Sequence, residues 1–168
     1  FKTAFNLWVK ILKKTPKSVL WLISKNNKFE KNLKEEFEKN KLNSERIIFS
    51  EPVPVKEYLA RFKFADLFLD TFPYNAHTTC NDSIWAGVPV LTKIGKSFHS
   101  RVASSLLKTS GLEELITRSD EEYISKAVKI ANDEKYLKQL KNKLNTFKDI
   151  NPLFDSKLYT RNLEKAYE

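Results

Sequence analysis

Short apolar runs alternate with longer amphipathic stretches along this chain, and that alternation limits its possible folds more than any other feature. Nearly continuous apolar runs cover residues 18–24, 47–49, 66–70 and 88–92, with 115–117 as a shorter fifth candidate. Such runs are typical of strands buried on both faces, as in a parallel sheet. The stretches between them predict helices over about 3–14, 29–42, 56–64 and 99–109, and a helix that follows residues 77–79 and ends around 86. The sequence therefore predicts an α/β domain with right-handed crossovers.

Residues that commonly cap helices support several of these boundaries. Thr3 is available as an N-cap for the first helix, and Gly111 can take the left-handed conformation after the helix over 99–109. The segment from Ser119 to Glu122 has the S-x-x-E pattern of a capping box, which predicts another helix. Two further helices are expected over about 134–147 and 156–167. We expect residues 1–168 to form a single domain with helices 134–167 packed on it.

Glycine is scarce, and this excludes two common ways of binding a nucleotide. The chain has three glycines, Gly87, Gly95 and Gly111, spaced too widely for a G-x-G-x-x-G turn or a G-x-x-x-x-G-K-[ST] phosphate loop. A formal net charge of +9 nevertheless points to an anionic partner, which could be nucleic acid, a membrane surface or a phosphorylated ligand. Any phosphate site must be built without a glycine-rich loop.

The composition also limits metal, disulfide and membrane chemistry. Cys80 is the only cysteine and there are two histidines, so we expect no intrachain disulfide and no metal site. No apolar run approaches the roughly 18 residues that span a bilayer, which favours a cytoplasmic protein. The sequence begins at Phe1 and contains no methionine, so we expect it to be part of a longer protein.

The stretch from Asp70 to Asp82, DTFPYNAHTTCND, has the richest potential chemistry. It runs from a strand through a turn to a helix start, where free N–H groups and the helix dipole attract anions. Thr78 and Thr79 add hydroxyl donors, His77 could donate another hydrogen bond, and Asp82 lies within reach of a ribose hydroxyl. The alternative is that Thr78 or Thr79 is merely an N-cap and His77 a loop residue.

Three motifs in residues 64–107 resemble the O-linked N-acetylglucosamine transferases and their SPINDLY-type bacterial relatives. They are D-T-x-P-Y-N-x-H-T-T, W-A-G-V-P-V-L-T and S-R-V-A-S-S, in that order. The resemblance extends over nearly the whole chain, from Leu7-Trp8 to Asn151-Pro-Leu-Phe154. It implies a Rossmann-like parallel sheet flanked by helices, the C-terminal half of a GT-B glycosyltransferase, which binds the UDP-sugar donor.

The resemblance also implies roles for single residues. In the family, the H-T-T-x-x-D segment contacts the donor, with the threonines on the diphosphate and the aspartate on the ribose. This assigns donor contacts to His77, Thr78, Thr79 and Asp82. No metal or other cofactor is implied.

A second group of implied residues surrounds the base. The loop that contains Val53 corresponds to the family's uracil loop, and Arg61 matches an arginine near the base, with a surface salt bridge as the alternative. Tyr58 stands where the family often has histidine, and its ring can still stack on a base. Val55 replaces a lysine of some members. The family's catalytic lysine falls upstream of the first matched helix, so the catalytic residues are unknown.

These features predict a UDP-GlcNAc-like binding domain of a glycosyltransferase that modifies protein Ser/Thr hydroxyls. The expected partners are a UDP-sugar donor, a protein or peptide acceptor, an N-terminal catalytic half and possible TPR repeats, without a membrane. The isolated chain should bind UDP weakly and transfer nothing. One rival hypothesis is a basic nucleic-acid-binding module built on the seven lysines between Lys126 and Lys148, which otherwise form a solvated face. The other is a catalytically degenerate interaction domain.

Overall fold

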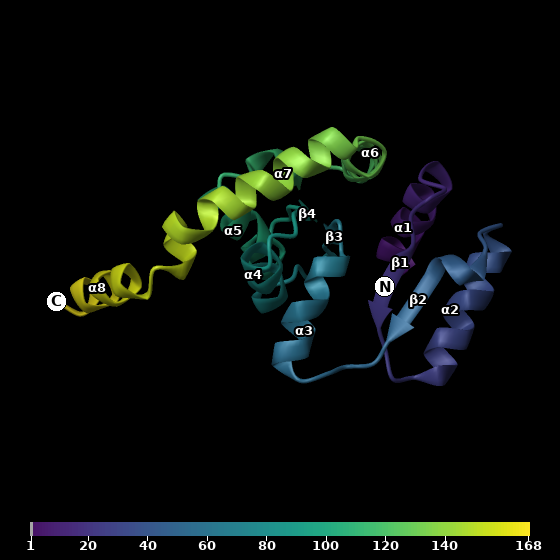
Figure 1. Cartoon of the computed structure of the whole chain (residues 1–168), viewed down its shortest axis with the longest axis horizontal. Coiled ribbons are helices and arrows are strands. Elements are labelled where there is room, and N and C mark those ends of the chain that lie inside the picture. The colour runs from purple at the N-terminus through teal and green to yellow at the C-terminus, as the bar shows by residue number, and fades with distance from the viewer. Residues whose placement is uncertain (1) are drawn as a thin grey trace.

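The computed structural model describes residues 2–168, and it confirms an α/β fold with parallel strands flanked by helices (Figure 1). The strands are β1 (Leu20–Ile23), β2 (Ile47–Ser50), β3 (Phe68–Leu69), β4 (Val90–Lys93) and β5 (Ile116–Thr117). The helices are α1 (Lys2–Lys14), α2 (Asn27–Lys39), α3 (Val55–Arg61), α4 (Thr78–Trp85), α5 (Val102–Thr109), α6 (Asp120–Asn132), α7 (Glu134–Phe147) and α8 (Ser156–Tyr167). Short 3-10 turns separate several of them, including η3 (Phe98–Ser100).

Every strand pair is parallel, but the strands form two ladders, β1–β2 and β3–β4–β5. β1 pairs along its whole length with β2, from Leu20 opposite Ile47 onward. β3 pairs with β4 over two positions, Phe68 with Val90 and Leu69 with Leu91. Leu69 of β3 also packs against the cluster that contains Leu20 and Ile47, so the two ladders are in hydrophobic contact.

The helices cover the ladders through three hydrophobic clusters. α1 and α2 pack on β1–β2 through residues such as Trp8 and Phe37. α4, α5 and α7 pack around β4, while Leu7 of α1 and Tyr123 of α6 meet at Leu91. Figure 1 shows α6 and α7 along one side of β4, with α3 below β3 and β4 in this view. These helices do not cover the carboxyl ends of β3 and β4, where the loops that follow these two strands begin.

The three residues predicted to cap helices have different outcomes in the structure. Thr3 is the second residue of α1, so it is not an N-cap. Ser119 is the N-cap of α6 as predicted, since its side chain accepts from the backbone N–H of Glu122 at 3.1 Å, but the Glu122 carboxylate accepts from the N–H of Arg118 instead of that of Ser119. Gly111 has a φ of +67° after α5, the left-handed conformation expected there.

Arg46 connects α1 to β1. Its guanidinium donates hydrogen bonds to the carbonyl oxygens of Leu12, Thr15 and Ser18 at 2.8–3.0 Å. The Leu12 and Thr15 carbonyls also accept from the backbone N–H groups of Thr15 and Ser18, at 3.3 and 2.9 Å, so Arg46 is a second donor to each. A single side chain thus ties the end of α1 to the turn into β1.

The C-terminal helices differ in how they pack. α7 buries Leu140 and Leu144, whereas α8 contributes no buried residue and projects away from the sheet in Figure 1. No helix within residues 2–168 is both long enough and apolar enough to cross a membrane.

Candidate functional site

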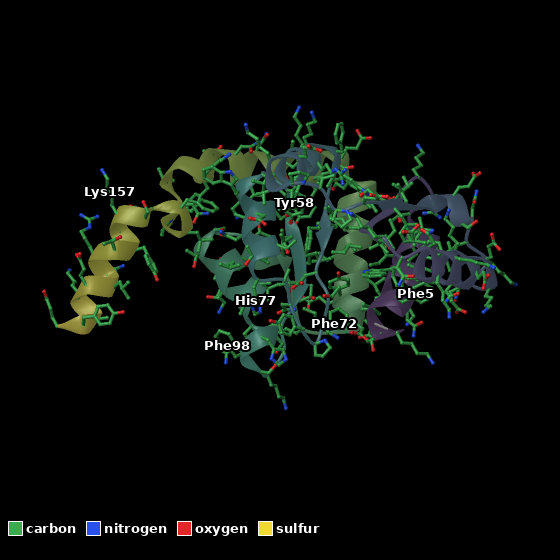
Figure 2. All side chains as sticks on the ribbon, turned by 90° about the horizontal axis from the view of Figure 1, so that it is seen from below. Phe5, Tyr58, Phe72, His77, Phe98 and Lys157 are labelled. Carbon is green, nitrogen blue, oxygen red and sulfur yellow. The ribbon has the colours of Figure 1, made fainter. Side chains whose placement is uncertain are left out.

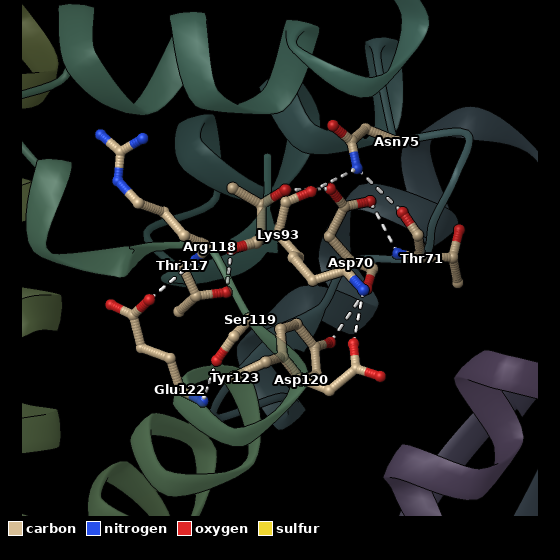
Figure 3. A network of polar contacts seen from close by, with 11 residues as sticks. Asp70, Thr71, Asn75, Lys93, Thr117, Arg118, Ser119, Asp120, Glu122 and Tyr123 are labelled. Atoms are coloured by element: carbon tan, nitrogen blue, oxygen red, sulfur yellow. Dashed lines mark hydrogen bonds and ion pairs between the residues drawn. The ribbon is translucent and has the colours of Figure 1, made fainter. Parts of the chain in front are cut away.

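Asp70 organises the loop between β3 and α4 (Figure 3). Its carboxylate accepts from the backbone N–H groups of Thr71 and Ala76 at 2.8 and 2.7 Å, and from the Thr92 hydroxyl of β4 at 2.6 Å. The Tyr123 hydroxyl of α6 donates to the Asp70 carbonyl at 2.9 Å. One residue at the end of β3 therefore joins the loop, the neighbouring strand and α6.

Burial controls the acidity of Asp70. The residue is almost completely buried, and desolvation raises the pKa of its carboxyl group to about 6, although the three hydrogen bonds oppose this shift. The network thus includes a carboxyl group that holds its proton more tightly than an exposed aspartate does.

Asn75 joins this loop to the next one, which follows β4. Its side-chain amide donates to the Thr71 carbonyl at 2.9 Å, and its backbone N–H donates to the His99 carbonyl at 3.0 Å. Like Asp70, Asn75 is 1% exposed. The loops at the carboxyl ends of β3 and β4 therefore form one connected surface.

An aromatic cluster lies on this surface, and we define it as Tyr74, His77, Phe98 and His99. The Tyr74 ring stacks with His77 and with His99, at centroid distances of 4.9 and 5.1 Å. Phe98 meets His77 edge-on at 6.3 Å. Tyr74 is 62% exposed and Phe98 is 81% exposed, so much of the cluster faces solvent.

The N-terminus of α4 opens beside this cluster. The helix begins at Thr78, with His77 as its N-cap, and no side chain in the described part of the chain caps it. The alternative in which Thr78 or Thr79 acts as the N-cap is therefore wrong, because both are already helical. The backbone N–H groups of the first turn of α4 and the positive end of its dipole are therefore available to an anion.

A shallow concavity of about 520 Å³ lies at this helix start. Its lining comes from β3, the following loop and the first turn of α4, namely Phe68, Thr71, Tyr74, Asn75, Ala76, His77, Thr78 and Thr79. Three predicted site residues, His77, Thr78 and Thr79, thus line the same concavity. Another concavity, of about 440 Å³, lies among charged side chains along α2 and contains none of the predicted site residues.

Tyr58 of α3 reaches the same helix from the other side. Its phenol lies near enough to Thr79 and Asp82 for both side chains to influence its pKa. Burial is the main cause that raises the pKa of this phenol, and the charge of Asp82 raises it further. Tyr58 also packs edge-on against Phe62 at 5.2 Å. The structure therefore brings together Tyr58, Thr79 and Asp82.

The remaining predicted residues lie in and beside the loop before α3. Arg61 donates to the Glu51 carbonyl at 2.7 Å, so it braces this loop. Within residues 2–168 it forms no salt bridge, the role considered as its alternative. Val53 is half-buried two residues before α3. These two residues shape the loop and do not line the concavity at α4.

The sequence did not reveal the roles of Asp70 and Asn75, and it suggested only a helix start for His99. The available signal was an acidic residue directly after a buried strand and before a proline-containing turn. Such a side chain can satisfy the backbone N–H groups of the turn.

Other candidate chemistry is limited. Among the residues that the structure describes, no group of three or more His, Cys, Asp or Glu side chains could hold a metal ion. Cys80 is buried in α4, and burial raises the pKa of its thiol well above the usual range. It is therefore a poor nucleophile.

Most lysines of α6 and α7 have partners within the chain, which weakens the nucleic-acid hypothesis. Five of the seven between residues 126 and 148 have a recorded contact: Lys126 with the Glu114 carbonyl, Lys141 with Asp66, Lys143 with Glu114, Lys129 over Tyr136 and Lys148 over Trp85. Each of these five lysines contacts a group of its own chain, and their positive charges are therefore spread over separate contacts.

Residues 2–163 match the family model described as glycosyl transferase family 41. The chain is 35% identical over 162 residues to a UDP-N-acetylglucosamine–peptide N-acetylglucosaminyltransferase of Caenorhabditis elegans, covering 96% of this chain and 14% of that protein. It is 36% identical over 163 residues to a probable enzyme of the same description from Arabidopsis thaliana, covering 96% and 17%. The chain therefore spans less than a fifth of these relatives.

The fold has a close counterpart among solved structures. A mutant O-GlcNAc transferase of Thermobaculum terrenum superposes with a TM-score of 0.91 and 34% sequence identity. The match covers 97% of this chain and 32% of that protein. The similarity extends over both ladders and the helices that cover them.

Proposed function

The chain belongs to glycosyl transferase family 41, and from this membership we propose that it is the donor-binding part of a longer glycosyltransferase. The donor would be UDP-N-acetylglucosamine or a similar UDP-sugar, and the acceptor a Ser/Thr hydroxyl of a protein. The names of the C. elegans and Arabidopsis relatives support this donor and a peptide acceptor. Transfer itself would need parts of the longer protein beyond this chain.

The uncapped start of α4, with Asp82 and Tyr58 one turn away, is the observation that carries the proposal. The N–H groups and hydroxyls of Thr78 and Thr79 can bind a diphosphate. Asp82 lies four residues farther along the helix, about 6 Å away, and can accept from the ribose. The base would then lie near Tyr58 and the loop that contains Val53 and is braced by Arg61.

The same arrangement suits the chemistry of transfer from a UDP-sugar. As the bond to the sugar breaks, negative charge grows on the departing diphosphate. A helix N-terminus that is fixed beforehand can stabilise this charge without reorganising. His77 Nε2 lies 3.4 Å from the His99 carbonyl oxygen, so Nδ1 would donate to the anion only when both ring nitrogens carry a proton. These groups would stabilise the leaving group, and we assign none of them the role of a general base.

Calorimetry with UDP tests the proposal on the chain itself. We expect weak binding, with a Kd on the order of 1 mM. The double substitution Thr79→Ala and Asp82→Ala should abolish it, because it removes a phosphate donor and the ribose acceptor. Thr146→Ala with Asp66→Ala changes the same residue types away from α4 and should leave binding unchanged. No UDP binding at millimolar concentration, or equal binding by the Thr79/Asp82 variant, would refute the proposal.

A further inference from the structure

Phe98 is a large apolar side chain that is held in solvent by a tightly fixed turn. The Gly95 N–H donates to the Ser100 carbonyl at 2.8 Å, and the hydroxyls of Ser97 and Ser100 are 2.9 Å apart. A Cβ atom at Gly95 would clash with the Ser100 hydroxyl, so the two sides of the turn are in close contact. The turn presents the Phe98 ring, which is 81% exposed. An exposed ring on a fixed support is suited to binding a ligand.

The turn is also tied to the start of α4. Asn75 donates its backbone N–H to the His99 carbonyl at 3.0 Å, and His77 Nε2 lies 3.4 Å from the same oxygen. Phe98 in turn meets the His77 ring edge-on. The position of Phe98 relative to α4 is therefore set by backbone contacts as well as by ring packing.

Groups of different chemistry follow one another along α4. Asp82, with Tyr58 near it, lies one turn into the helix, Thr78 and Thr79 form the helix start, and the aromatic cluster lies beyond that start. Figure 2 shows Tyr58, His77 and Phe98 in this order across the molecule. A nucleotide sugar has a matching order of base and ribose, diphosphate, and sugar. A donor bound as proposed above would place its sugar beyond the helix start, at the aromatic cluster.

We propose that Phe98, supported by His77 and Tyr74, forms the contact surface for the pyranose ring of the bound donor. The inference rests on the proposed function, because the diphosphate at α4 fixes where the sugar can lie. One face of a pyranose consists largely of C–H groups and can pack on an aromatic ring, while the exposed hydroxyl of Tyr74 offers a polar contact at the rim. Phe98 is then a specificity-determining residue for the sugar.

Saturation-transfer NMR with UDP-N-acetylglucosamine tests this inference on the 168-residue chain, because it reports separately on uracil, ribose and pyranose protons. Phe98→Ala should reduce the saturation of pyranose protons relative to uracil protons about three- to tenfold. Uracil saturation should remain. Tyr159→Ala removes a ring that is 67% exposed on α8, far from α4, and should leave the whole pattern unchanged.

Each other outcome overturns the inference. If pyranose and uracil signals of Phe98→Ala both equal those of the wild type, Phe98 does not contact the sugar, and the proposed function still stands. If both signals fall together while circular dichroism shows an intact fold, Phe98 does not act specifically on the sugar. If the wild-type chain saturates no ligand proton, the proposed function fails and the inference fails with it.

Discussion

Replacing Asp70 by asparagine should change how the stability of this chain depends on pH. Asp70 is 1% exposed, and burial raises the pKa of its carboxyl group from 3.8 to about 6. Between these two values the folded chain keeps a proton that the unfolded chain has released. Rising pH therefore favours the unfolded chain over this range, and the contribution of Asp70 to the free energy of unfolding falls.

The size of the effect follows from the two pKa values. They differ by about 2 units, and each unit corresponds to about 1.4 kcal/mol, so wild type should lose about 3 kcal/mol through this group. Asparagine has nearly the same shape and does not titrate. Its carbonyl oxygen can still accept from the N–H groups of Thr71 and Ala76, and its amide can donate to the Thr92 hydroxyl.

Urea denaturation followed by circular dichroism measures this difference between about pH 3 and about pH 7. Wild type should lose about 3 kcal/mol relative to Asp70→Asn as the pH rises. Asp66→Asn is the matched control, because the Asp66 side chain is 75% exposed, and this variant should follow wild type. A constant difference between wild type and Asp70→Asn, or one that favours wild type at high pH, would show that burial does not dominate at Asp70.

Three further substitutions test contacts away from the candidate site, each by urea denaturation at neutral pH. Arg46→Lys should lower the free energy of unfolding by about 1–3 kcal/mol, because one ammonium group cannot replace the guanidinium at three carbonyls; an unchanged midpoint would contradict this. Gly111→Ala should cost about 1–2 kcal/mol through its φ of +67°, since the nearest atom to an added Cβ is 3.9 Å away, and Gly111→Asn should cost less. Ser119→Ala should cost about 1 kcal/mol by removing the α6 cap, whereas Ser125→Ala, in the same helix, should cost little.

The sequence predicted the fold class because its main signals are local. A strand buried in a parallel sheet is apolar along its length, and the Ser119 capping box needs only four consecutive residues. Strand lengths were harder to predict, because a strand extends only as far as a neighbour lies beside it. The apolar run 66–70 forms a ladder over Phe68 and Leu69 alone, where β4 is opposite.

Some residues of the candidate site could likewise be predicted from local sequence, and others could not. His77, Thr78 and Thr79 could be predicted because they are adjacent in the chain and mark a helix start. The influence of Asp82 on the pKa of Tyr58 depends on where α3 lies relative to α4, which no local pattern determines. Likewise, the hydrogen bond from Arg61 to the Glu51 carbonyl depends on the conformation of the loop before α3, which the sequence alone did not predict. A carboxylate with two backbone N–H donors, such as Asp70, has no sequence signature beyond its place after a strand.

The loop between β3 and α4 is held in place by protein contacts alone. Asp70 and Asn75 bind its backbone from within, at Thr71 and Ala76, and His99 holds it from the neighbouring loop. Fixing the backbone of a flexible residue costs about 1–2 kcal/mol of conformational entropy. For this loop, that entropy is lost when the chain folds. The loop is therefore preorganised, and ordering it would reduce the binding free energy of a ligand at α4 only slightly.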